Sequence, residues 1–406
     1  MKILVITSVY PGLHDEKAIT RTVQYFCEEW TKSGYEVRVI HTYSLFPKIY
    51  YYFSNVFREK ISSLLGFTVP IFECNEDVLF ELNGVLVNKM PVKKIVPHSL
   101  ISEKDAKQCA DAIIRILDND RFKPDLILGH WVNPQYMIIK ELKKYFKSRT
   151  SLVFHNDCTD RNIKKLNLKE MHNYIDAIGC RSEQYSKNVK GKLNLKRDPF
   201  ICYSGVPDKD FDKYSDVLIE KNKGNDFLYV GRLVKYKNID VIIEALSIAF
   251  PAKNFNLKII GSGGELENIK SLISEKGLEK NVRILGRLPR EKVFEHMRAA
   301  SCFVMVSTGE TFGMVYIEAM MCSCVTIATK GGGVDGVIQD GKNGFLVDDR
   351  NIEALSKLFQ KISKMNPNII SQIRKNSVLT ASNYKDSKVS DRYIKDIFTW
   401  DNRSDV

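Results

Sequence analysis

The sequence predicts an α/β protein with two doubly wound domains, and three observations carry that prediction. Short apolar runs rich in Val and Ile alternate with amphipathic runs that have the period of a helix. This alternation occurs twice, once in each half of the chain. The 406 residues, 44% of them hydrophobic, are enough for two buried cores. Strands that alternate with helices pair in parallel, so each half predicts its own parallel sheet.

In the first half, the chain begins with an apolar run that leads directly into a loop, as a first strand does. A helix is expected at Thr20–Ser33, because Val23, Phe26 and Trp30 recur at helical spacing. A second helix is expected at Ser102–Leu117 by the same criterion. The expected strands are Lys2–Thr7, Glu36–His41, Leu126–Gly129, Ser151–His155, Ala177–Cys180 and Phe200–Tyr203.

The second half repeats the pattern with shorter connections. Its expected strands are Asp226–Tyr229, Leu257–Ile260, Val282–Leu285, Cys302–Val306 and Val325–Ala328. Its expected helices are Asn238–Ala249, Glu265–Lys276, Arg290–Ala299 and Val315–Met321.

The domain boundaries follow from composition. The stretch Gly205–Asn225 is polar and separates the two series, so we expect an N-terminal domain at residues 1–205 and a C-terminal domain at 206–385. Residues 386–406 form an aromatic and charged helical run, which is expected to pack back on the N-terminal domain. Two doubly wound domains would face each other across a central crevice.

Composition excludes several classes of protein. No apolar run reaches the roughly 18 residues of a membrane span, and the first apolar run is too short for a signal peptide. The nine cysteines are scattered, so we expect reduced thiols in the cytoplasm and no metal framework. The net charge of +12 suits an anionic surface or acceptor, and no nucleic-acid recognition motif accompanies it.

Residues 44–75 interrupt the alternation with aromatic residues interleaved with Lys48, Arg58 and Lys60. Such a segment is typical of a membrane interface, and it is equally typical of an insertion that packs on the core. The sequence leaves both readings open. Peripheral contact with the inner face of the plasma membrane is therefore an expectation of the first reading.

The most informative stretch runs from Glu310 to Glu318. An apolar strand precedes it, a small polar turn follows the strand, and an apolar helix then begins. That order presents backbone N–H groups to an anion. A carboxylate on each side of an anion site suggests a ligand that carries both phosphates and hydroxyls, such as a sugar nucleotide.

A basic turn and two Gly-rich turns follow other strands of the second half. Arg232 and Lys237 flank the turn that begins at Gly231, where a guanidinium fork and an ammonium could hold a diphosphate; a solvated basic turn is the alternative. The stretches Gly261–Gly264 and Lys330–Asp335 are Gly-rich, and each is weak evidence alone.

In the first half, His130 ends one expected strand, and His155 and Asp157 end the next. Ligands gather beyond the carboxyl ends of parallel strands, so these side chains would face the crevice. Packed or capped histidines are the competing reading. The local spacing does not support a metal site.

Together these motifs resemble those of the family-4 glycosyltransferases, nucleotide-sugar enzymes of the GT-B fold. The resemblance covers most of the chain and is strongest from about residue 227 to 347. The matching motifs, in order, are Gly231-Arg232 with Lys237, Gly261-Ser-Gly263, the Glu310 and Glu318 pair, Gly331 to Ile338, and Asn343 to Val347. The form Gly-x-Gly-Val-Asp looks like a subgroup common in bacterial capsule and exopolysaccharide clusters.

The resemblance implies a role for each matching residue. Arg232 and Lys237 would hold the diphosphate, Glu310 would bind donor-sugar hydroxyls, and His130 would touch the donor sugar near the reacting carbon. Glu318 would bind the ribose. The remaining donor-binding positions are Phe312, Gly313 and Met314, through their N–H groups, and Gly261, Gly263, Arg287 and Leu288 around the base.

The sequence departs from the family pattern at several places. Residues Pro11–Arg21 replace a Gly-Gly loop after the first strand, although Arg21 could compensate. Asn238 stands where Gly usually follows the Lys, and we expect it to cap the next helix. Ser323 replaces a Gly, Val325 a Pro, and Asn156 a Gly.

The resemblance implies a retaining transfer of a sugar from a UDP- or GDP-sugar to an acceptor hydroxyl, without a metal or other cofactor. A polyprenyl-diphosphate-linked saccharide of bacterial surface polysaccharide synthesis is the expected acceptor. Two alternatives remain: a non-catalytic sugar-nucleotide-binding partner subunit, and a sugar-nucleotide 2-epimerase of the same fold, which the glutamate pair argues against.

Overall fold

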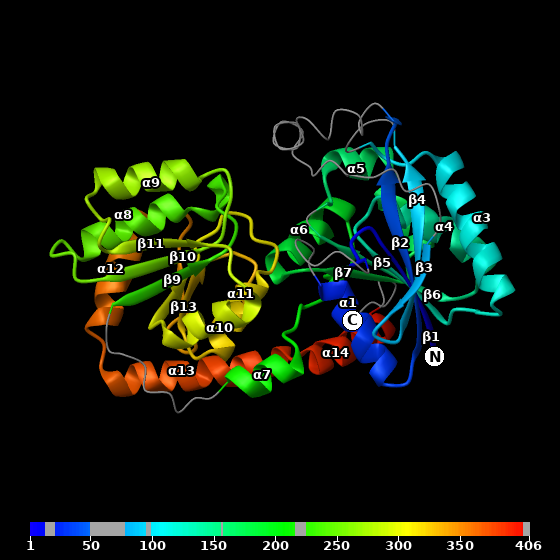
Figure 1. The fold of residues 1–406 in the computed structure, drawn as a ribbon. Helices are drawn as coiled ribbons and strands as arrows, with labels where there is room; N and C mark the ends of the chain where they lie inside the picture. The colour runs from blue at the N-terminus through cyan, green and yellow to red at the C-terminus, as the bar shows by residue number, and fades with distance from the viewer. Residues whose placement is uncertain (13–20, 49–77, 95–98, 156, 216–224, 401–406) are drawn as a thin grey trace. The chain divides into compact units, whose positions relative to one another are not determined.

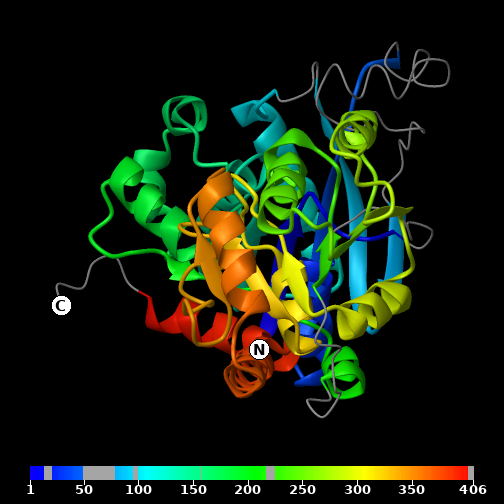
Figure 2. The same ribbon diagram turned by 90° about the vertical axis from the view of Figure 1, so that its left-hand side faces the viewer.

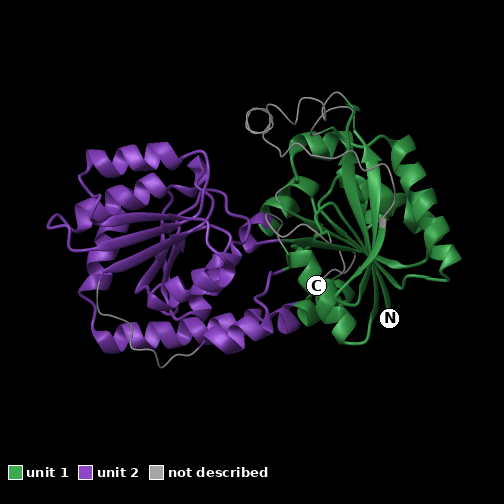
Figure 3. Ribbon diagram, viewed as in Figure 1, with its two compact units in different colours: residues 1–180, 186–202, 390–406 green, residues 181–185, 203–389 purple. Residues whose placement is uncertain are grey.

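The computed structural model describes residues 1–12, 21–48, 78–94, 99–155, 157–215 and 225–400. The chain divides into two units (Figure 3). Unit 1 holds residues 1–180, 186–202 and 390–406, and unit 2 holds residues 181–185 and 203–389. Each unit has a mainly parallel sheet with helices on both faces (Figures 1 and 2), so the expected α/β class with two doubly wound sheets is confirmed.

Unit 1 contains an eight-stranded sheet in the order β3-β4-β2-β1-β5-β6-β7-β8. The chain order reverses between β1 and β5, which pair in parallel. The strands are β1 (Lys2–Thr7), β2 (Glu36–Leu45), β3 (Val78–Leu82), β4 (Val85–Lys93), β5 (Leu126–His130), β6 (Arg149–Phe154), β7 (Ala177–Cys180) and β8 (Phe200–Ile201).

One hairpin in unit 1 does not follow the predicted pattern. Strands β3 and β4 pair antiparallel around Asn83 and Gly84, both of which have positive φ angles of 51° and 80°. Asn-Gly is the preferred pair for a two-residue hairpin turn, because both positions require that conformation. The dipeptide was therefore a usable signal that the prediction of a purely parallel sheet missed.

The helices of unit 1 follow the apolar periodicity. In α1 (Thr22–Lys32) the buried Val23, Phe26, Cys27 and Trp30 form one face. In α3 (Glu103–Asn119) the Ser102 side chain accepts from the Asp105 N–H and caps the helix. The other helical segments are α4 (Gln135–Tyr145), α5 (Asp160–Lys165), the 3₁₀ helix η1 (Leu168–Asn173) and α6 (Glu183–Leu193), which begins in unit 2.

Unit 2 contains a six-stranded, entirely parallel sheet in the order β11-β10-β9-β12-β13-β14. Its chain order reverses between β9 and β12. The strands are β9 (Asp226–Val230), β10 (Asn256–Ile260), β11 (Val282–Gly286), β12 (Cys302–Val304), β13 (Val325–Thr329) and β14 (Phe345–Val347). Strand β12 ends at Val304, two residues earlier than predicted.

Two helical layers cover this sheet: α8, α9 and α12 lie on one side, and α10, α11 and α13 on the other (Figure 1). The buried positions of these helices are almost all aliphatic or aromatic, so apolar side chains cover both faces of the sheet. The bounds are α7 (Asp208–Tyr214), η2 (Lys235–Lys237), α8 (Ile239–Ala249), α9 (Leu266–Glu275), α10 (Arg290–Ala299), α11 (Met314–Met321), α12 (Ile352–Ser363), α13 (Pro367–Ala381) and η3 (Ser382–Tyr384).

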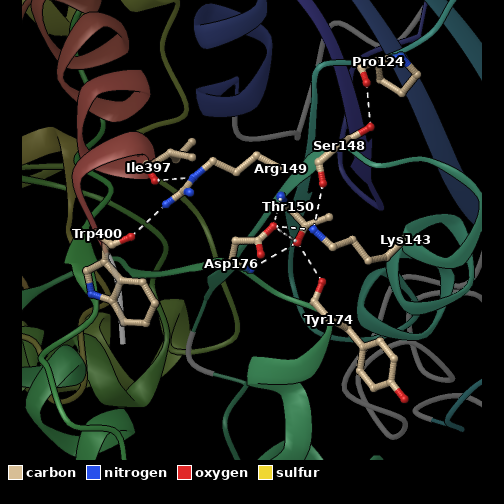
Figure 4. Close-up of polar contacts among 9 residues, drawn as sticks. All are labelled: Pro124, Lys143, Ser148, Arg149, Thr150, Tyr174, Asp176, Ile397 and Trp400. Carbon is tan, nitrogen blue, oxygen red and sulfur yellow. Dashed lines mark hydrogen bonds and ion pairs between the residues drawn. The ribbon is translucent and has the colours of Figure 1, made fainter. Parts of the chain in front are cut away.

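The last helix, α14 (Asp386–Thr399), begins in unit 2 and ends in unit 1. Its unit 1 portion is held by Arg149 at the start of β6, whose Nε and Nη2 donate to the carbonyls of Ile397 and Trp400 at 2.9 and 2.8 Å (Figure 4). A guanidinium at a helix C-terminus satisfies carbonyls that have no partner within the helix. Arg149 therefore ties the end of the chain to the sheet.

The neighbouring residue of β6 joins a second polar cluster, centred on Asp176 (Figure 4). Asp176 accepts from Lys143 Nζ at 2.6 Å and from the N–H and hydroxyl of Thr150 at 2.8 and 3.0 Å. Burial favours a raised pKa for Asp176, but these donors outweigh it and the pKa lies below its usual value. The carboxylate thus stabilises the connection into β7 while it is ionised.

Two further expectations from the sequence concern disulfides and membrane-spanning helices. Eight cysteines lie in the described residues, and no disulfide joins any two of these eight. Within those residues no helix is long and apolar enough to cross a membrane.

Replacing Arg149 by Ala should lower the free energy of unfolding by about 2 kcal/mol, since two charged hydrogen bonds are lost. Amide hydrogen exchange at residues 390–400 should rise with it. Lys144→Ala, which breaks only an exposed pair with Glu141, is the control and should stay within about 0.5 kcal/mol of the wild type. Unchanged exchange in the Arg149 variant would contradict this anchoring role.

Candidate functional site

The predicted donor-site residues of unit 2 gather at one edge of its sheet. Because all strands of this sheet are parallel, the loops that follow them emerge at the same edge. The loop residues are Arg232 and Lys237 after β9, Gly261 and Gly263 after β10, Arg287 and Leu288 after β11, and Glu310 to Met314 after β12. The Gly331–Gly333 turn follows β13 at the same edge.

Lys237 and Glu310 meet at the point where the strand order of unit 2 reverses. Lys237 Nζ donates to Glu310 Oε2, and the two side chains are only 11% and 16% exposed. Lys237 follows β9 and Glu310 follows β12, which are the neighbouring strands on either side of the reversal. Crevices at such positions are where doubly wound sheets bind their ligands.

A polar cluster around the buried Asn238 fixes these two loops against each other. Asn238 Nδ2 donates to the Val306 carbonyl, at 2.7 Å, and to Thr308 Oγ1, at 2.9 Å. Asp349 accepts from Thr308 at 2.8 Å, and Arg350 donates to Asn238 Oδ1 at 2.8 Å. Lys237 and Glu310 therefore sit on backbone that is held by four neighbouring polar side chains.

The prediction that Asn238 caps α8 through its side chain is wrong. Asn238 occupies the N-cap position but has a φ of 51° and makes no side-chain cap hydrogen bond. Its amide is instead committed to the loop after β12. The left-handed conformation gives a physical reason for the family's glycine here, and Asn is the side-chain-bearing residue that tolerates it best.

The glycines of the site are needed for close packing between loops. A Cβ on Gly261 would lie 1.8 Å from the Gly231 carbonyl oxygen, and one on Gly263 would lie 2.2 Å from that of Leu233. A Cβ on Gly333 would lie 2.6 Å from the backbone nitrogen of Phe312. The Gly-rich turns thus pack directly on the backbone that precedes Lys237 and follows Glu310.

Phe312, Gly313 and Met314 lead into α11. The Phe312 ring is 2% exposed and packs against Tyr203 and Tyr384, with the Arg181 guanidinium 6.0 Å from the ring centre. Gly313 is the N-cap residue, with a φ of 78°. The buried ring therefore holds the start of α11, where backbone N–H groups lack partners within the helix.

The other predicted cations lie nearby and are more exposed. Arg232 is exposed and donates to the Tyr236 hydroxyl at 2.7 Å. Arg287 is exposed and donates to Ser262 Oγ at 2.6 Å, while Leu288 is half-buried. Both arginines therefore have side chains oriented by a neighbouring hydroxyl.

Glu318 is 9% exposed and forms an ion pair with Arg290 Nη2 at 2.8 Å. Arg290 also donates to Asp210 at 3.2 Å and lies over the Phe294 ring. Sequence reasoning did not identify Arg290 as part of the site. Its only signal was a cation at the first position of a predicted helix.

His130 lies in unit 1, at the end of β5 beside the reversal of strand order. Its side chain is fully buried, with Nδ1 3.0 Å from His155 Nε2 and Nε2 3.3 Å from the Tyr393 hydroxyl. His155 is partly exposed, whereas His130 is not. In unit 1 itself, His130 therefore contacts side chains of the protein through both ring nitrogens.

Asp157 supports this region through the backbone. Its carboxylate accepts from the N–H groups of Val132 and His155. Burial raises the pKa of Asp157 to about 6, although both N–H groups act to lower it. Asp157 is thus a positioning group for the two strand ends.

Several sequence expectations fall outside the described residues. These are residues 13–20 of the altered first loop, Asn156, and residues 49–77 of the aromatic segment. Among the residues that the structure describes, no group of three or more His, Cys, Asp or Glu side chains could hold a metal ion.

The C-terminal part of the chain is similar to a known protein family. Residues 210–377, which lie in unit 2, match the model of the family "Glycosyl transferases group 1". The match agrees with the predicted resemblance over this segment, whereas membership of the whole chain in the family and its capsule and exopolysaccharide subgroup remain predictions.

Curated relatives agree. The chain is 32% identical to an uncharacterized glycosyltransferase of Methanocaldococcus jannaschii over 56% of its own length and 62% of that protein. It is 29% identical to the alpha-monoglucosyldiacylglycerol synthase of Acholeplasma laidlawii, over 48% of each chain. The matched region therefore spans about half to three fifths of these relatives.

Solved structures match almost the whole chain. A glycosyltransferase from Rickettsia africae superposes with a TM-score of 0.70 at 16% identity, over 98% of both chains. Anabaena HepE in complex with UDP gives 0.67 at 17% identity, over 98% of this chain and 100% of that one. These matches show that the fold is GT-B, as the sequence predicted.

Gly333→Ala should destabilise the protein by about 1–3 kcal/mol, because the new methyl group would displace the backbone at Phe312. Urea unfolding measures the change. Gly264→Ala is the matched control: its Cβ would meet nothing within 4 Å, so stability should hardly change. Equal stability of the two variants would refute the close contact between these loops.

Proposed function

We propose that the protein is a retaining, metal-independent glycosyltransferase that moves a hexose from a nucleoside diphosphate sugar to an acceptor hydroxyl. UDP- and GDP-sugars are the candidate donors. The acceptor we propose is a lipid-linked saccharide, in the synthesis of a bacterial surface polysaccharide such as a capsule or exopolysaccharide. The enzyme would act in the cytoplasm, at the inner face of the plasma membrane.

The single observation that carries this proposal is the meeting of Lys237 and Glu310 where the strand order of unit 2 reverses. A cation and a carboxylate side by side can hold two different parts of one ligand. Lys237 suits a phosphate oxygen, and Glu310 suits sugar hydroxyl groups. A nucleoside diphosphate sugar presents both within a few bonds of each other.

The catalytic contribution we assign to this edge is electrostatic. Negative charge develops on the diphosphate as the bond to the sugar breaks. Lys237, Arg232 and the N–H groups at the start of α11 would stabilise that charge. Because the sheet and the Asn238 cluster fix these groups beforehand, they need little reorganisation during the reaction.

The proposed route has no covalent intermediate. Glu310 is engaged by Lys237 and belongs to a turn suited to binding hydroxyls, so we assign it to the donor sugar. The leaving diphosphate would then accept the proton of the attacking hydroxyl on the same face of the sugar. The charge balance needs no further base, and the cations named above replace a metal.

The names of similar proteins support the donor and the acceptor class. One matching structure is Anabaena HepE in complex with UDP-glucose, a nucleoside diphosphate sugar. The Acholeplasma laidlawii relative and a mannosyltransferase of Mycolicibacterium smegmatis are both named for lipid products or acceptors. The positive charge of the chain suits an anionic lipid diphosphate.

Lys237→Ala should lower turnover roughly 100- to 1,000-fold while leaving the fold intact, as loss of one preorganised charge contact does. A thermal-shift screen of UDP-, GDP-, dTDP- and ADP-sugars first identifies the donor, since binding raises the melting temperature. Radiolabelled sugar transfer is then measured with EDTA present, which the wild type should tolerate.

Lys235→Ala, an exposed lysine of the same loop, is the control and should retain wild-type turnover. Full activity of the Lys237 variant would remove the phosphate assignment, and complete loss of wild-type activity in EDTA would remove the metal-independent mechanism. A non-catalytic binding subunit would instead show donor binding without transfer or donor hydrolysis.

A further inference from the structure

Tyr236 lies in the 3₁₀ turn that carries Lys237, and its side chain contacts both cations assigned to the diphosphate. Its hydroxyl accepts from Arg232 Nη2 at 2.7 Å. Its ring centre lies 5.6 Å from Lys237 Nζ. One aromatic side chain therefore connects a cation at the start of this loop with a cation at its end.

The backbone beneath these side chains is held at two points. The N–H group of Thr308, in the loop after β12, donates to the Tyr236 carbonyl at 2.8 Å. The hydroxyl of Tyr229, which is fully buried in β9, donates to the Arg232 carbonyl at 2.9 Å. The positions of the Arg232 and Tyr236 side chains therefore depend mainly on their own side-chain torsions.

The pKa of Tyr229 shows that Arg232 belongs to the same group of charges as Glu310. Burial raises the pKa of the Tyr229 hydroxyl, and the nearby Glu310 carboxylate raises it further. The Arg232 guanidinium lowers it. Both charges act on one buried phenol, so Arg232 lies close to the ion pair of Glu310 with Lys237.

The tyrosine hydroxyl is well suited to orient this arginine. An exposed arginine loses much rotamer freedom when it binds a ligand, whereas a tyrosine places its hydroxyl with only two side-chain torsions. A guanidinium has five N–H donors, and the bond to Tyr236 uses one of them, while a bidentate contact with phosphate needs two. Because a phenol is neutral, it orients Arg232 without offsetting the positive charge, as a carboxylate would.

We propose that Tyr236 is a positioning residue that holds Arg232 and Lys237 in one arrangement before the diphosphate binds. Its hydroxyl sets the direction of the Arg232 guanidinium, and its ring lies against the Lys237 ammonium. Part of the ordering of these two long side chains is then complete in the unliganded protein. This inference rests on the proposed function, because the ligand is the diphosphate of the donor.

Tyr236→Phe tests the hydroxyl, because it keeps the ring and removes only the acceptor for Arg232. We expect it to weaken binding of the nucleoside diphosphate about three- to tenfold, the cost of ordering one long side chain on binding. Titration calorimetry on the full-length protein measures the affinity, with the base identified in the thermal-shift screen. The ring is 43% exposed, so the melting temperature without ligand should stay unchanged.

Tyr145→Phe is the matched control and should keep wild-type affinity. Tyr145 is also exposed, and its hydroxyl bonds to a charged side chain, Asp118, in unit 1. Wild-type affinity in the Tyr236→Phe variant would overturn the proposal. A lower melting temperature without ligand would also overturn it, because the residue would then act through the stability of the fold.

A double-mutant cycle shows whether the hydroxyl acts through Arg232. Arg232→Met alone should weaken diphosphate binding about 10- to 100-fold, as loss of a charged hydrogen bond does. Adding Tyr236→Phe to Arg232→Met should then have no further effect, because the group that the hydroxyl orients is gone. An equal further loss in the double variant would overturn the proposal, since the hydroxyl would then act on the ligand directly.

Tyr236→Leu tests the ring in the same Arg232→Met background. It should weaken diphosphate binding about two- to fivefold relative to Tyr236→Phe in that background, because Lys237 loses its aromatic neighbour. Equal affinities of these two double variants would overturn the part of the proposal that concerns Lys237.

Sugar transfer by the same proteins separates this inference from the proposed function. If the wild type binds the diphosphate and the cycle behaves as stated, but no sugar is transferred, the proposed function fails and the positioning role stands. If the wild type transfers sugar but Tyr236→Phe binds the diphosphate as tightly as the wild type, the positioning role fails and the proposed function stands. A wild type that binds no nucleoside diphosphate would overturn both.

Discussion

The contact between Lys237 and Glu310 is the interaction on which the edge of unit 2 depends. A buried ion pair gains little stability by itself, because desolvation of two charges offsets most of their attraction. Its value here is positional. The pair joins the loops after β9 and β12, which are neighbours only because the strand order reverses between them. Removing either partner would leave the other charge largely buried and unpaired, which lowers the free energy of unfolding without changing the fold.

The surrounding residues are arranged so that this pair has one geometry. Hydrogen bonds among four polar side chains hold the two loops together; the residues are Asn238, Thr308, Asp349 and Arg350. The glycines at 261, 263 and 333 allow neighbouring turns to approach the same backbone closely. Any side chain at those positions would push Lys237 or Glu310 out of place. The close packing of the loops therefore also sets the positions of the two charged side chains of the site.

The sequence predicted most of the strands, because buried parallel strands leave a clear apolar run: Lys2–Thr7 and Ala177–Cys180 match β1 and β7. The predicted helix Arg290–Ala299 likewise matches α10. The prediction missed the β3–β4 hairpin and its Asn83-Gly84 turn. It also missed Arg290 and the partners of Asn238. Those contacts join residues far apart in the chain, which local patterns do not report. At two departures from the family pattern, the structure explains the glycine that is replaced. Asn238 and Ser323 both have left-handed backbones, a conformation that favours glycine.

The central claim is that Lys237 binds the diphosphate of a nucleotide. It is tested most directly by the ratio of affinities for a nucleoside diphosphate and its monophosphate, by titration calorimetry. The base is that of the donor found in the thermal-shift screen, and the proteins are the wild type, Lys237→Met and Lys235→Met. We expect the wild type and the Lys235 variant to prefer the diphosphate by about 10- to 100-fold, as one charged hydrogen bond would give, and the Lys237 variant to lose most of that preference. An unchanged ratio in the Lys237 variant would contradict the account.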